Sequence, residues 1–371
     1  MGVLFRIKQY FKMYIQNKYL PRIYEKAVSK TEVDKDKIIF ADMHSEGIPY
    51  SMQTVYDALL RQGKKPLNYC ADIGKMSALG GIKYMKNFMK DYASAGTVYI
   101  CSYFLPVSSC KKRSETKVVQ LWHSGGLMKK MGYDTSDDIP EYYIGNVTAN
   151  YDLVTVSAPV CVPVWESALR LPKGITKSLG IARTDLMYDE KWLADSKKLF
   201  KEAYPEAEGK KVVLYAPTFS GNAAHPECPG LDAGLELLFK KEFPEYFLII
   251  RPHPHMRGKY PEYFDDRFGR ISTERLLPET DILITDYSSI LFDYSIFRKP
   301  FVLFCPDLSK YSEERGLYVD IKTFPTTVAE RASELAAAIR EEKWGDKEEL
   351  EEFFQKYMGA CDGHVTERII C

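Results

Sequence analysis

Short apolar runs that alternate with helical stretches constrain the fold of this chain more than any other feature of its sequence. Residues 281–285 are one such run, whose centre of Ile282, Leu283 and Ile284 is typical of a buried parallel strand. The polar residues 286–289 follow directly, and the apolar spacing of residues 290–297 predicts a helix. Repeated alternation of this kind predicts an α/β protein whose parallel sheets are covered by helices. The runs expected to form strands are 37–41, 66–70, 97–101, 117–121, 153–156, 177–180, 212–216, 247–251, 282–285 and 301–304.

The length of the chain favours two domains, because 371 residues exceed the size of one typical hydrophobic core. The strand-like runs fall into two series, separated by a charged stretch at 185–209, so we expect two Rossmann-like halves with a cleft between them. A Gly-x-Gly-x-x-Gly pattern is absent, which argues against a nicotinamide or flavin cofactor. The expected ranges are a basic helix at 1–30, an N-terminal domain at 31–190, a C-terminal domain at 191–345 and a helical tail at 346–371.

The composition excludes several classes of protein. Lysine plus arginine and aspartate plus glutamate both number 51, so no net charge favours nucleic acid as a partner. The eight cysteines include no Cys-x-x-Cys pair, which predicts neither a zinc site nor a disulfide framework, and a reducing compartment. No apolar run reaches the ~20 residues that a membrane-spanning helix needs. We therefore expect an intracellular protein.

The range 1–30 departs from this neutral average, since its only acidic residue is Glu25. Leu4, Ile7, Phe11 and Ile15 recur at helical spacing among the basic residues. A basic helix with such a stripe can lie in the headgroup region of an anionic membrane. The same stripe could equally pack against its own domain, and the sequence leaves both interpretations open.

Polar residues follow several predicted strands at the point where each strand ends, which is where ligands bind in open α/β sheets. His123 lies after the run 117–121 and is followed by two glycines and by the basic pair Lys129 and Lys130. His253 lies after the run 247–250 between two prolines that stiffen the backbone. These surroundings favour functional roles for both histidines.

The other histidines and the acidic residues give weaker signals. His44 and His225 lack a surrounding motif and are interpreted as structural, and the roles of His255 and His364 stay open. Asp34 and Asp36 lie in a charged run that is typical of solvated surface rather than of a metal site. No metal is therefore expected, although the sequence leaves a magnesium requirement open.

Seven motifs in series resemble the CDP-glycerol:poly(glycerophosphate) glycerophosphotransferase family, which builds teichoic acids and related capsular polymers. They run in the family's order and cover most of the chain from about Lys117 onward. They are Trp122 to Leu127 with Lys129 to Tyr133, Leu179 to Asp185, Tyr215 to Thr218, Arg251 to Pro254, Thr285 to Ser289 with Asp293, Glu314 to Gly316, and Asp362-Gly363 with Arg368.

The resemblance implies a GT-B fold, in which two Rossmann-like domains with parallel sheets face each other across a cleft. It implies an acceptor-side domain at 31–190 and a CDP-donor-binding domain at 191–345. The family acts at the cytoplasmic face of the bacterial membrane on lipid-linked acceptors, which favours peripheral attachment through the basic helix to an anionic membrane surface. The family's two essential histidines would fall on His123 and His253. The donor would contact Ser124, Gly125, Gly126, Leu127, Arg183, Pro217, Thr218, Arg251, Pro252, Ser288, Ser289 and Asp293 together with these two histidines.

The chain departs from the family at one motif, where Ser124, Gly125 and Gly126 replace the usual Gly-Thr-Pro. This loss of a hydroxyl and of a proline bears on the acceptor or on the polyol that the donor carries. The extra N-terminal module of the long polymerases is also absent, which makes a primer or short-chain transferase at least as plausible as a polymerase.

The reaction implied is transfer of glycerol phosphate, or a related polyol phosphate, from a CDP-linked donor to a hydroxyl of a lipid-linked saccharide or polyol-phosphate acceptor, with release of CMP. His123 is expected to be the base, and His253, Arg251 and the Ser288–Ser289 turn to stabilise the diphosphate. The reverse assignment of the histidines stays open. The alternatives are a GT-B glycosyltransferase that uses a nucleotide-sugar donor, a sugar-nucleotide isomerase, and an inactive membrane-tethered assembly factor, because fold alone does not decide chemistry.

Overall fold

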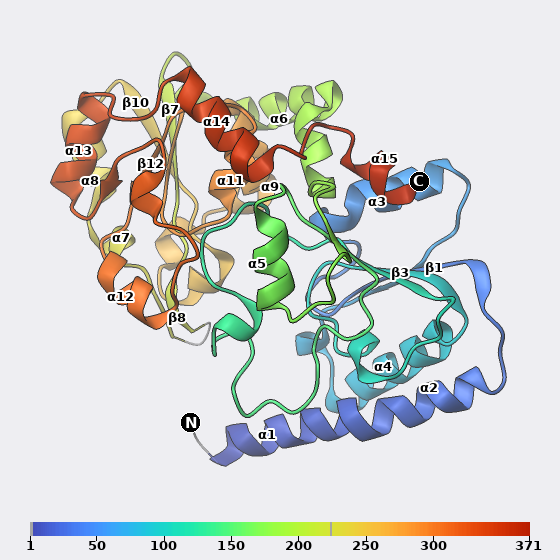
Figure 1. Cartoon of the computed structure of the whole chain (residues 1–371). Coiled ribbons are helices and arrows are strands. Elements are labelled where there is room, and N and C mark those ends of the chain that lie inside the picture. Colours follow the sequence, from blue (N-terminus) through green and yellow to red (C-terminus); the bar gives the residue numbers. More distant parts are fainter. Residues whose placement is uncertain (1–2, 223–224) are drawn as a thin grey trace. The chain divides into compact units, whose positions relative to one another are not determined.

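The computed structural model describes residues 3–222 and 225–371 (Figure 1). The chain divides into two compact units. The N-terminal unit comprises residues 1–123, 138–185 and 360–371, and the C-terminal unit comprises residues 124–137 and 186–359. The boundary at 185/186 lies near the predicted one at 190, but segment 124–137, predicted for the N-terminal domain, belongs to the C-terminal unit. The predicted tail at 346–371 divides between the two units after residue 359.

The N-terminal unit contains a parallel sheet with the strand order β2-β1-β3-β4-β5-β6. The last five residues of β1 and most residues of β3 and β4 are buried in its core, where the fully buried Phe40 pairs in register with Asn68 of β2 and Tyr99 of β3. The strands are β1 Asp34–Asp42, β2 Leu67–Cys70, β3 Ala95–Ile100, β4 Lys117–Gln120, β5 Leu153–Thr155 and β6 Thr176–Lys177. The helices are α1 Val3–Tyr14, α2 Leu20–Val28, α3 Tyr50–Arg61, α4 Ala78–Tyr92, α5 Cys161–Ala168 and α15 Val365–Ile370.

The C-terminal unit contains a second parallel sheet, with the strand order β10-β7-β11-β12-β13. Buried residues of α8 and α13 pack with β7, β11 and β12 in one hydrophobic cluster, while Phe353 of α14 stacks on Phe292 of α11. The strands are β7 Lys211–Ala216, β10 Tyr246–Ile250, β11 Ile282–Thr285, β12 Phe301–Phe304 and β13 Val328–Ala329, with a separate hairpin of β8 Ser220–Asn222 and β9 His225–Glu227. The helices are α6 Glu190–Ala203, α7 Pro229–Asp232, α8 Leu235–Glu242, α9 Arg267–Arg270, α10 Thr273–Leu276, α11 Ile290–Ser295, α12 Leu308–Glu314, α13 Ala332–Arg340 and α14 Lys347–Met358.

The α/β prediction is confirmed, and each predicted run overlaps an observed strand. The run 177–180 is largely wrong, because it shares only Lys177 with β6. The strand β13 and the β8–β9 hairpin were missed, since each is too short to show a periodic pattern. The helix expected over 290–297 is α11, and it ends at Ser295 after only 6 residues.

The two halves of the N-terminal helical region differ in how far their apolar side chains are exposed. In α1, Ile7 is 60% exposed and Phe11 is 55% exposed, and Leu4 lies outside the residues whose side chains are described. A π-helical turn at Ile15–Tyr19 follows, and in α2 the buried Tyr24 packs against Tyr92 of α4 with ring centroids 5.1 Å apart. The stripe thus divides, because Ile7 and Phe11 are exposed whereas Ile15 is buried. Among the described residues, no helix has both the length and the apolarity that crossing a membrane requires.

Candidate active site

The carboxyl edge of the N-terminal sheet holds an array of hydrogen-bonded polar residues. Asp42 ends β1, and its Oδ1 accepts a hydrogen bond from the Ser102 hydroxyl at 2.6 Å. The Gln120 amide at the end of β4 donates to the Ser102 carbonyl at 2.9 Å, and its Oε1 accepts from the Trp122 backbone N–H at 3.0 Å. These bonds stabilise Trp122 at φ = 54°, a backbone conformation that bulky residues rarely adopt. The turn that carries His123 is therefore built from three strand ends.

The ring of His123 is oriented by the backbone of β3's outgoing loop. Its Nδ1 lies 2.9 Å from the Cys101 carbonyl oxygen. A carbonyl oxygen only accepts, so Nδ1 carries the hydrogen, and in the neutral ring Nε2 keeps its lone pair. Trp122 stacks on the same ring with centroids 4.9 Å apart and an interplanar angle of 20°. This exposed imidazole is thus arranged as a proton acceptor at Nε2.

Arg183 supports the same turn. Its buried guanidinium donates to the His123 carbonyl oxygen and lies 6.0 Å from the centroid of the Tyr50 ring. Arg183 was predicted to contact the donor, and the structure shows its guanidinium hydrogen-bonded to the backbone of the predicted base.

Residues 124–137, which include the predicted Ser124, Gly125, Gly126 and Leu127, pack within the C-terminal unit. Met128 accepts a backbone hydrogen bond from Tyr318 at 2.7 Å, and Lys130 donates one to Gly316 at 3.0 Å. Gly126 has φ = 70°, and a Cβ there would lie 2.1 Å from the Phe292 ring. The close approach that this glycine permits is therefore to an aromatic ring of the protein.

A pocket of about 380 Å³ opens at the carboxyl edge of the C-terminal sheet. Six predicted site residues line it, namely Pro217, Thr218, Arg251, Pro252, His253 and Ser288. Ser289 and Asp293 were also predicted, but neither belongs to the lining, and Asp293 is buried on α11. Residues that the sequence analysis missed complete the walls: Ala216, Pro254, Phe268, Ser272, Thr273, Glu274 and Ile290. A periodic pattern could not have found the segment 268–274, because α9 and α10 are single turns.

His253 is an exposed residue whose ring is nevertheless crowded by protein atoms. Its ring centroid lies 4.8 Å from that of His255 and 5.2 Å from that of Phe219. Partial removal from water, with smaller electrostatic effects of His255 and Lys129, lowers the pKa of His253 to about 4. Its Nδ1 accepts the His255 backbone N–H at 3.3 Å. The ring is therefore neutral at pH 7, with its hydrogen on Nε2.

The Arg251 side chain makes its contacts mainly with other residues of the protein. Its Nη2 donates to the Tyr204 hydroxyl at 2.8 Å and to the Arg267 carbonyl at 3.1 Å, and the guanidinium lies 4.7 Å from the centroid of the Phe268 ring. Its exposure is 4%, and burial lowers the pKa of the guanidinium. Arg251 thus shapes the pocket wall and brings positive charge to it.

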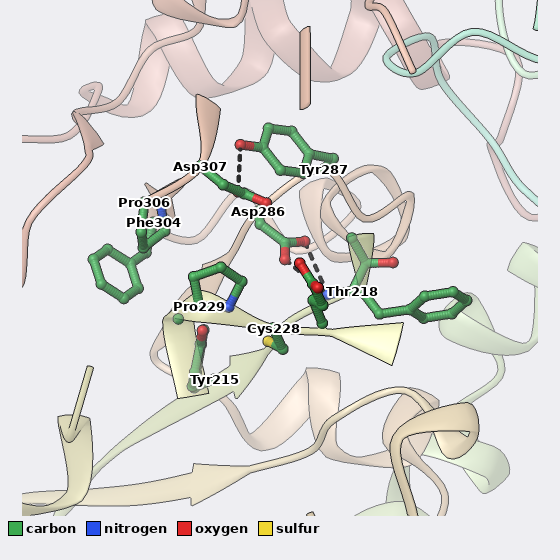
Figure 2. Close-up of a pocket in the computed structure, with 12 residues that line it drawn as sticks. Tyr215, Thr218, Cys228, Pro229, Asp286, Tyr287, Phe304, Pro306 and Asp307 are labelled. Carbon is green, nitrogen blue, oxygen red and sulfur yellow. Dashed lines mark hydrogen bonds between the residues drawn. The ribbon is translucent and has the colours of Figure 1, made fainter. Parts of the chain in front are cut away.

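The Thr218 loop is anchored by Asp286, which directly follows β11. Figure 2 shows the Asp286 carboxylate directed at Thr218, whose backbone N–H lies 3.0 and 2.9 Å from the two carboxylate oxygens. Burial raises the pKa of Asp286 to about 7. The Tyr287 hydroxyl beside it donates to Asp307 at 3.0 Å. The enclosed cavity between these residues measures about 10 Å³, room for roughly one water molecule.

The Ser288–Ser289 turn differs from the phosphate-binding helix start that the sequence suggested. Ser289 precedes α11, but its side chain makes no capping hydrogen bond, while the Ser288 hydroxyl accepts the Ile290 N–H at 3.4 Å. A helix of 6 residues sums few peptide dipoles. The Ser288 hydroxyl in the pocket wall is therefore the stronger candidate for a phosphate contact. Among the described residues, no group of three or more His, Cys, Asp or Glu side chains could hold a metal ion.

Comparison with known proteins gives a consistent set of relatives. The sequence profile of the CDP-glycerol:poly(glycerophosphate) glycerophosphotransferase family matches residues 23–371. A teichoic acid ribitol-phosphate primase of Bacillus spizizenii is 31% identical over 91% of this chain and 90% of its own length. A teichoic acid poly(ribitol-phosphate) polymerase of the same species is 28% identical over 91% of this chain and 56% of its own length. A teichoic acid glycerol-phosphate primase of Bacillus subtilis is 31% identical over 58% of this chain and 57% of its own length.

Solved structures share the fold at low sequence identity. The structure of the wall teichoic acid polymerase TagF has a TM-score of 0.70 at 19% identity, over 98% of this chain and 96% of that one. The Staphylococcus aureus MnaA–UDP structure has a TM-score of 0.54 at 13% identity, over 90% of this chain and 95% of that one.

Proposed function

The chain belongs to the CDP-glycerol:poly(glycerophosphate) glycerophosphotransferase family, and on that premise we propose that it transfers a polyol phosphate from a CDP-linked donor to a hydroxyl of a lipid-linked acceptor. The reaction releases CMP and serves teichoic acid or capsular polymer synthesis at the cytoplasmic face of the bacterial membrane. The proposal includes the GT-B arrangement, in which two Rossmann-like domains face each other across a cleft, and it includes no resident metal.

The observation that carries the proposal is the orientation of His123. The Cys101 carbonyl fixes the hydrogen on Nδ1, so Nε2 is the ring nitrogen with the lone pair that can take a proton from an acceptor hydroxyl. A base in this position typically contributes ~10²–10⁴ to a rate. The C-terminal pocket, with Thr218, Ser288 and the neutral His253, supplies groups that can donate hydrogen bonds to a diphosphate.

In the proposed step, the acceptor oxygen forms a bond to the phosphorus that carries the polyol. The bond between this phosphorus and the oxygen that bridges to the cytidine phosphate breaks, and its electron pair leaves with CMP. The acceptor proton moves to Nε2 of His123. Hydrogen bonds from His253 and the pocket hydroxyls stabilise the negative charge on the leaving CMP.

The polyol is left open within this proposal, because the relatives include ribitol-phosphate and glycerol-phosphate enzymes. The test is mass spectrometry of a lipid-linked disaccharide acceptor after reaction with CDP-glycerol, CDP-ribitol or a UDP-sugar in parallel, each with magnesium or with EDTA. We expect a polyol phosphate mass increment and CMP from one CDP donor, with or without magnesium. A sugar increment from the UDP-sugar, without CMP from either CDP donor, would contradict the proposal and support the glycosyltransferase.

We also propose that α1 attaches the protein to an anionic membrane surface. Ile7, Phe11 and Tyr14 are exposed on α1, and the 67% exposed Ile144 lies beside this region because its carbonyl accepts the Asn17 side chain. Changing Phe11 and Tyr14 to serine should reduce sedimentation with anionic vesicles. The matched control is Leu79→Ser, which removes an exposed apolar side chain from α4 of the same unit. Equal binding by both variants would contradict this attachment.

A further inference from the structure

The lining of the donor pocket comes from two groups of residues. One group follows β7, β10 and β11 and includes Thr218, His253 and Ser288. The other group, here called the nucleoside end, is Phe268 and the segment Ser272–Glu274, which lies between β10 and β11. Both groups carry hydroxyls, but the imidazole that suits a diphosphate belongs to the first group, and the aromatic ring and the carboxylate that suit a base belong to the second.

The nucleoside end is held rigidly by its neighbours. Phe268 lies under the Arg251 guanidinium at 4.7 Å and beside the Phe264 ring at 4.6 Å between centroids. Leu276 of α10 is fully buried, and Arg275 donates to the Ser196 hydroxyl at 3.0 Å while it covers the Trp192 ring. These contacts fix α10 against α6, so the position of Glu274 in the pocket wall is preorganised.

Glu274 is the one carboxylate in the lining of this pocket. The side chain is half-buried, and within residues 3–222 and 225–371 its carboxylate makes no hydrogen bond or ion pair. A carboxylate in a site for a negatively charged nucleotide disfavours the phosphates. It is therefore suited to a part of the ligand that donates hydrogen bonds.

We propose that Glu274 accepts a hydrogen bond from the exocyclic amino group of the donor's cytosine and so selects cytidine over uridine nucleotides. An ionised carboxylate only accepts, and the cytosine N4 amino group only donates. Uracil carries a carbonyl oxygen at the same position, which the carboxylate repels. This inference rests on the proposed function, because it assigns a specificity-determining residue within the same donor site.

The test is isothermal titration of CDP and UDP into the full-length protein and into its Glu274→Gln variant. The wild type should prefer CDP by about 5- to 150-fold, the discrimination expected of one good base contact. Glutamine can donate to the uracil oxygen as well as accept from the cytosine amine, so the preference should fall to about threefold or less. Glu262→Gln, an exposed change outside the pocket, should keep the wild-type ratio.

The outcomes separate this inference from the proposed function. An equal loss of CDP and UDP affinity in Glu274→Gln would place the carboxylate on the ribose and overturn the assignment, as would an unchanged ratio. A Glu274→Asp variant, which retains the acceptor, should still prefer CDP, and loss of its preference would also count against the assignment. If the wild type releases CMP from a CDP-polyol but Glu274→Gln keeps the wild-type ratio, the inference fails alone. If the wild type binds neither nucleotide and releases no CMP, the proposed function fails with it.

Discussion

The two sheet edges of this protein hold their histidines in opposite ways. In the N-terminal unit, the Cys101 carbonyl receives the Nδ1 hydrogen of His123, so the basic atom is Nε2. In the C-terminal unit, His253 uses Nδ1 as an acceptor for the His255 backbone N–H, so Nε2 carries the hydrogen of the neutral ring. The same residue type, after a strand of the same kind, is thus prepared to accept a proton in one unit and to donate a hydrogen bond in the other.

This difference assigns separate tasks to the two histidines. His123 is suited to act as the base, and His253 is suited to contact the diphosphate of the donor. The residues around the two histidines also fit these separate tasks. Hydrogen bonds between backbone and amide groups stabilise the turn that carries His123. His253 instead lines a pocket whose wall also includes hydroxyl groups and the buried Arg251.

The largest effect should come from His123→Ala. Removing the base should lower the rate of CMP release by at least ~10²–10⁴, while the affinity for CDP stays within about threefold. Single-turnover CMP release and CDP titration check both quantities. His364→Ala removes an exposed histidine of the same unit and is the control. Turnover of His123→Ala near the wild-type rate would refute the assignment of the base.

Asp286→Asn tests the anchor of the C-terminal edge through pH. The pKa of Asp286 is raised to about 7 from the usual 3.8, so between these values the folded state binds more protons than the unfolded state. Its contribution to stability is therefore complete below pH 4 and is lost as the pH rises toward 7. Asparagine still accepts from Thr218 but does not titrate. From pH 5 to 8, the free energy of unfolding of the wild type should fall by about 3 kcal/mol relative to the variant in urea titrations. Parallel pH profiles would contradict the assigned pKa.

Arg251→Ala should act mainly on stability. Loss of the charged hydrogen bonds to Tyr204 and Arg267 should cost about 2 kcal/mol in the free energy of unfolding. The comparison is His253→Ala in the same pocket, whose exposed ring should matter for stability by about 0.5 kcal/mol or less. Equal destabilisation by the two variants would show that the pocket residues do not divide into structural and ligand-binding groups.

The smallest effect should be the uptake of a fraction of a proton by His253 when CDP binds. Its low pKa of about 4 should rise when a diphosphate binds, because negative charge favours the imidazolium. CDP binding near pH 5 should therefore take up a fraction of a proton, measured by titration in buffers of different ionisation enthalpy. His253→Ala should abolish this uptake, and an unchanged uptake in the variant would assign it to another group.

The sequence predicted the parts of the site that depend on strand position. His123, Thr218, His253 and Ser288 each follow a continuous apolar run, and a parallel sheet gathers such residues at one edge of each unit. The tautomer of His123 could not be predicted, because it depends on a carbonyl 22 residues earlier in the chain.

Other features of the site depend on contacts that leave no local pattern. The Gly125–Gly126 pair suggested a ligand, yet Gly126 faces the Phe292 ring, which lies far along the chain. Glu274 could not be identified from the sequence for a different reason, because its helical turn is too short to produce a periodic pattern. Long-range packing and single-turn helices are therefore the parts that required the structure.

The most direct test of the division between the two histidines is nitrogen-15 NMR of the protein labelled at histidine, with and without CDP, assigned through His123→Ala and His253→Ala. We predict hydrogen on Nδ1 and an unprotonated Nε2 for His123 in both states, and a CDP-induced shift of the His253 signals toward the protonated ring. Hydrogen on Nε2 of His123, or His253 signals that saturating CDP leaves unchanged, would contradict this division.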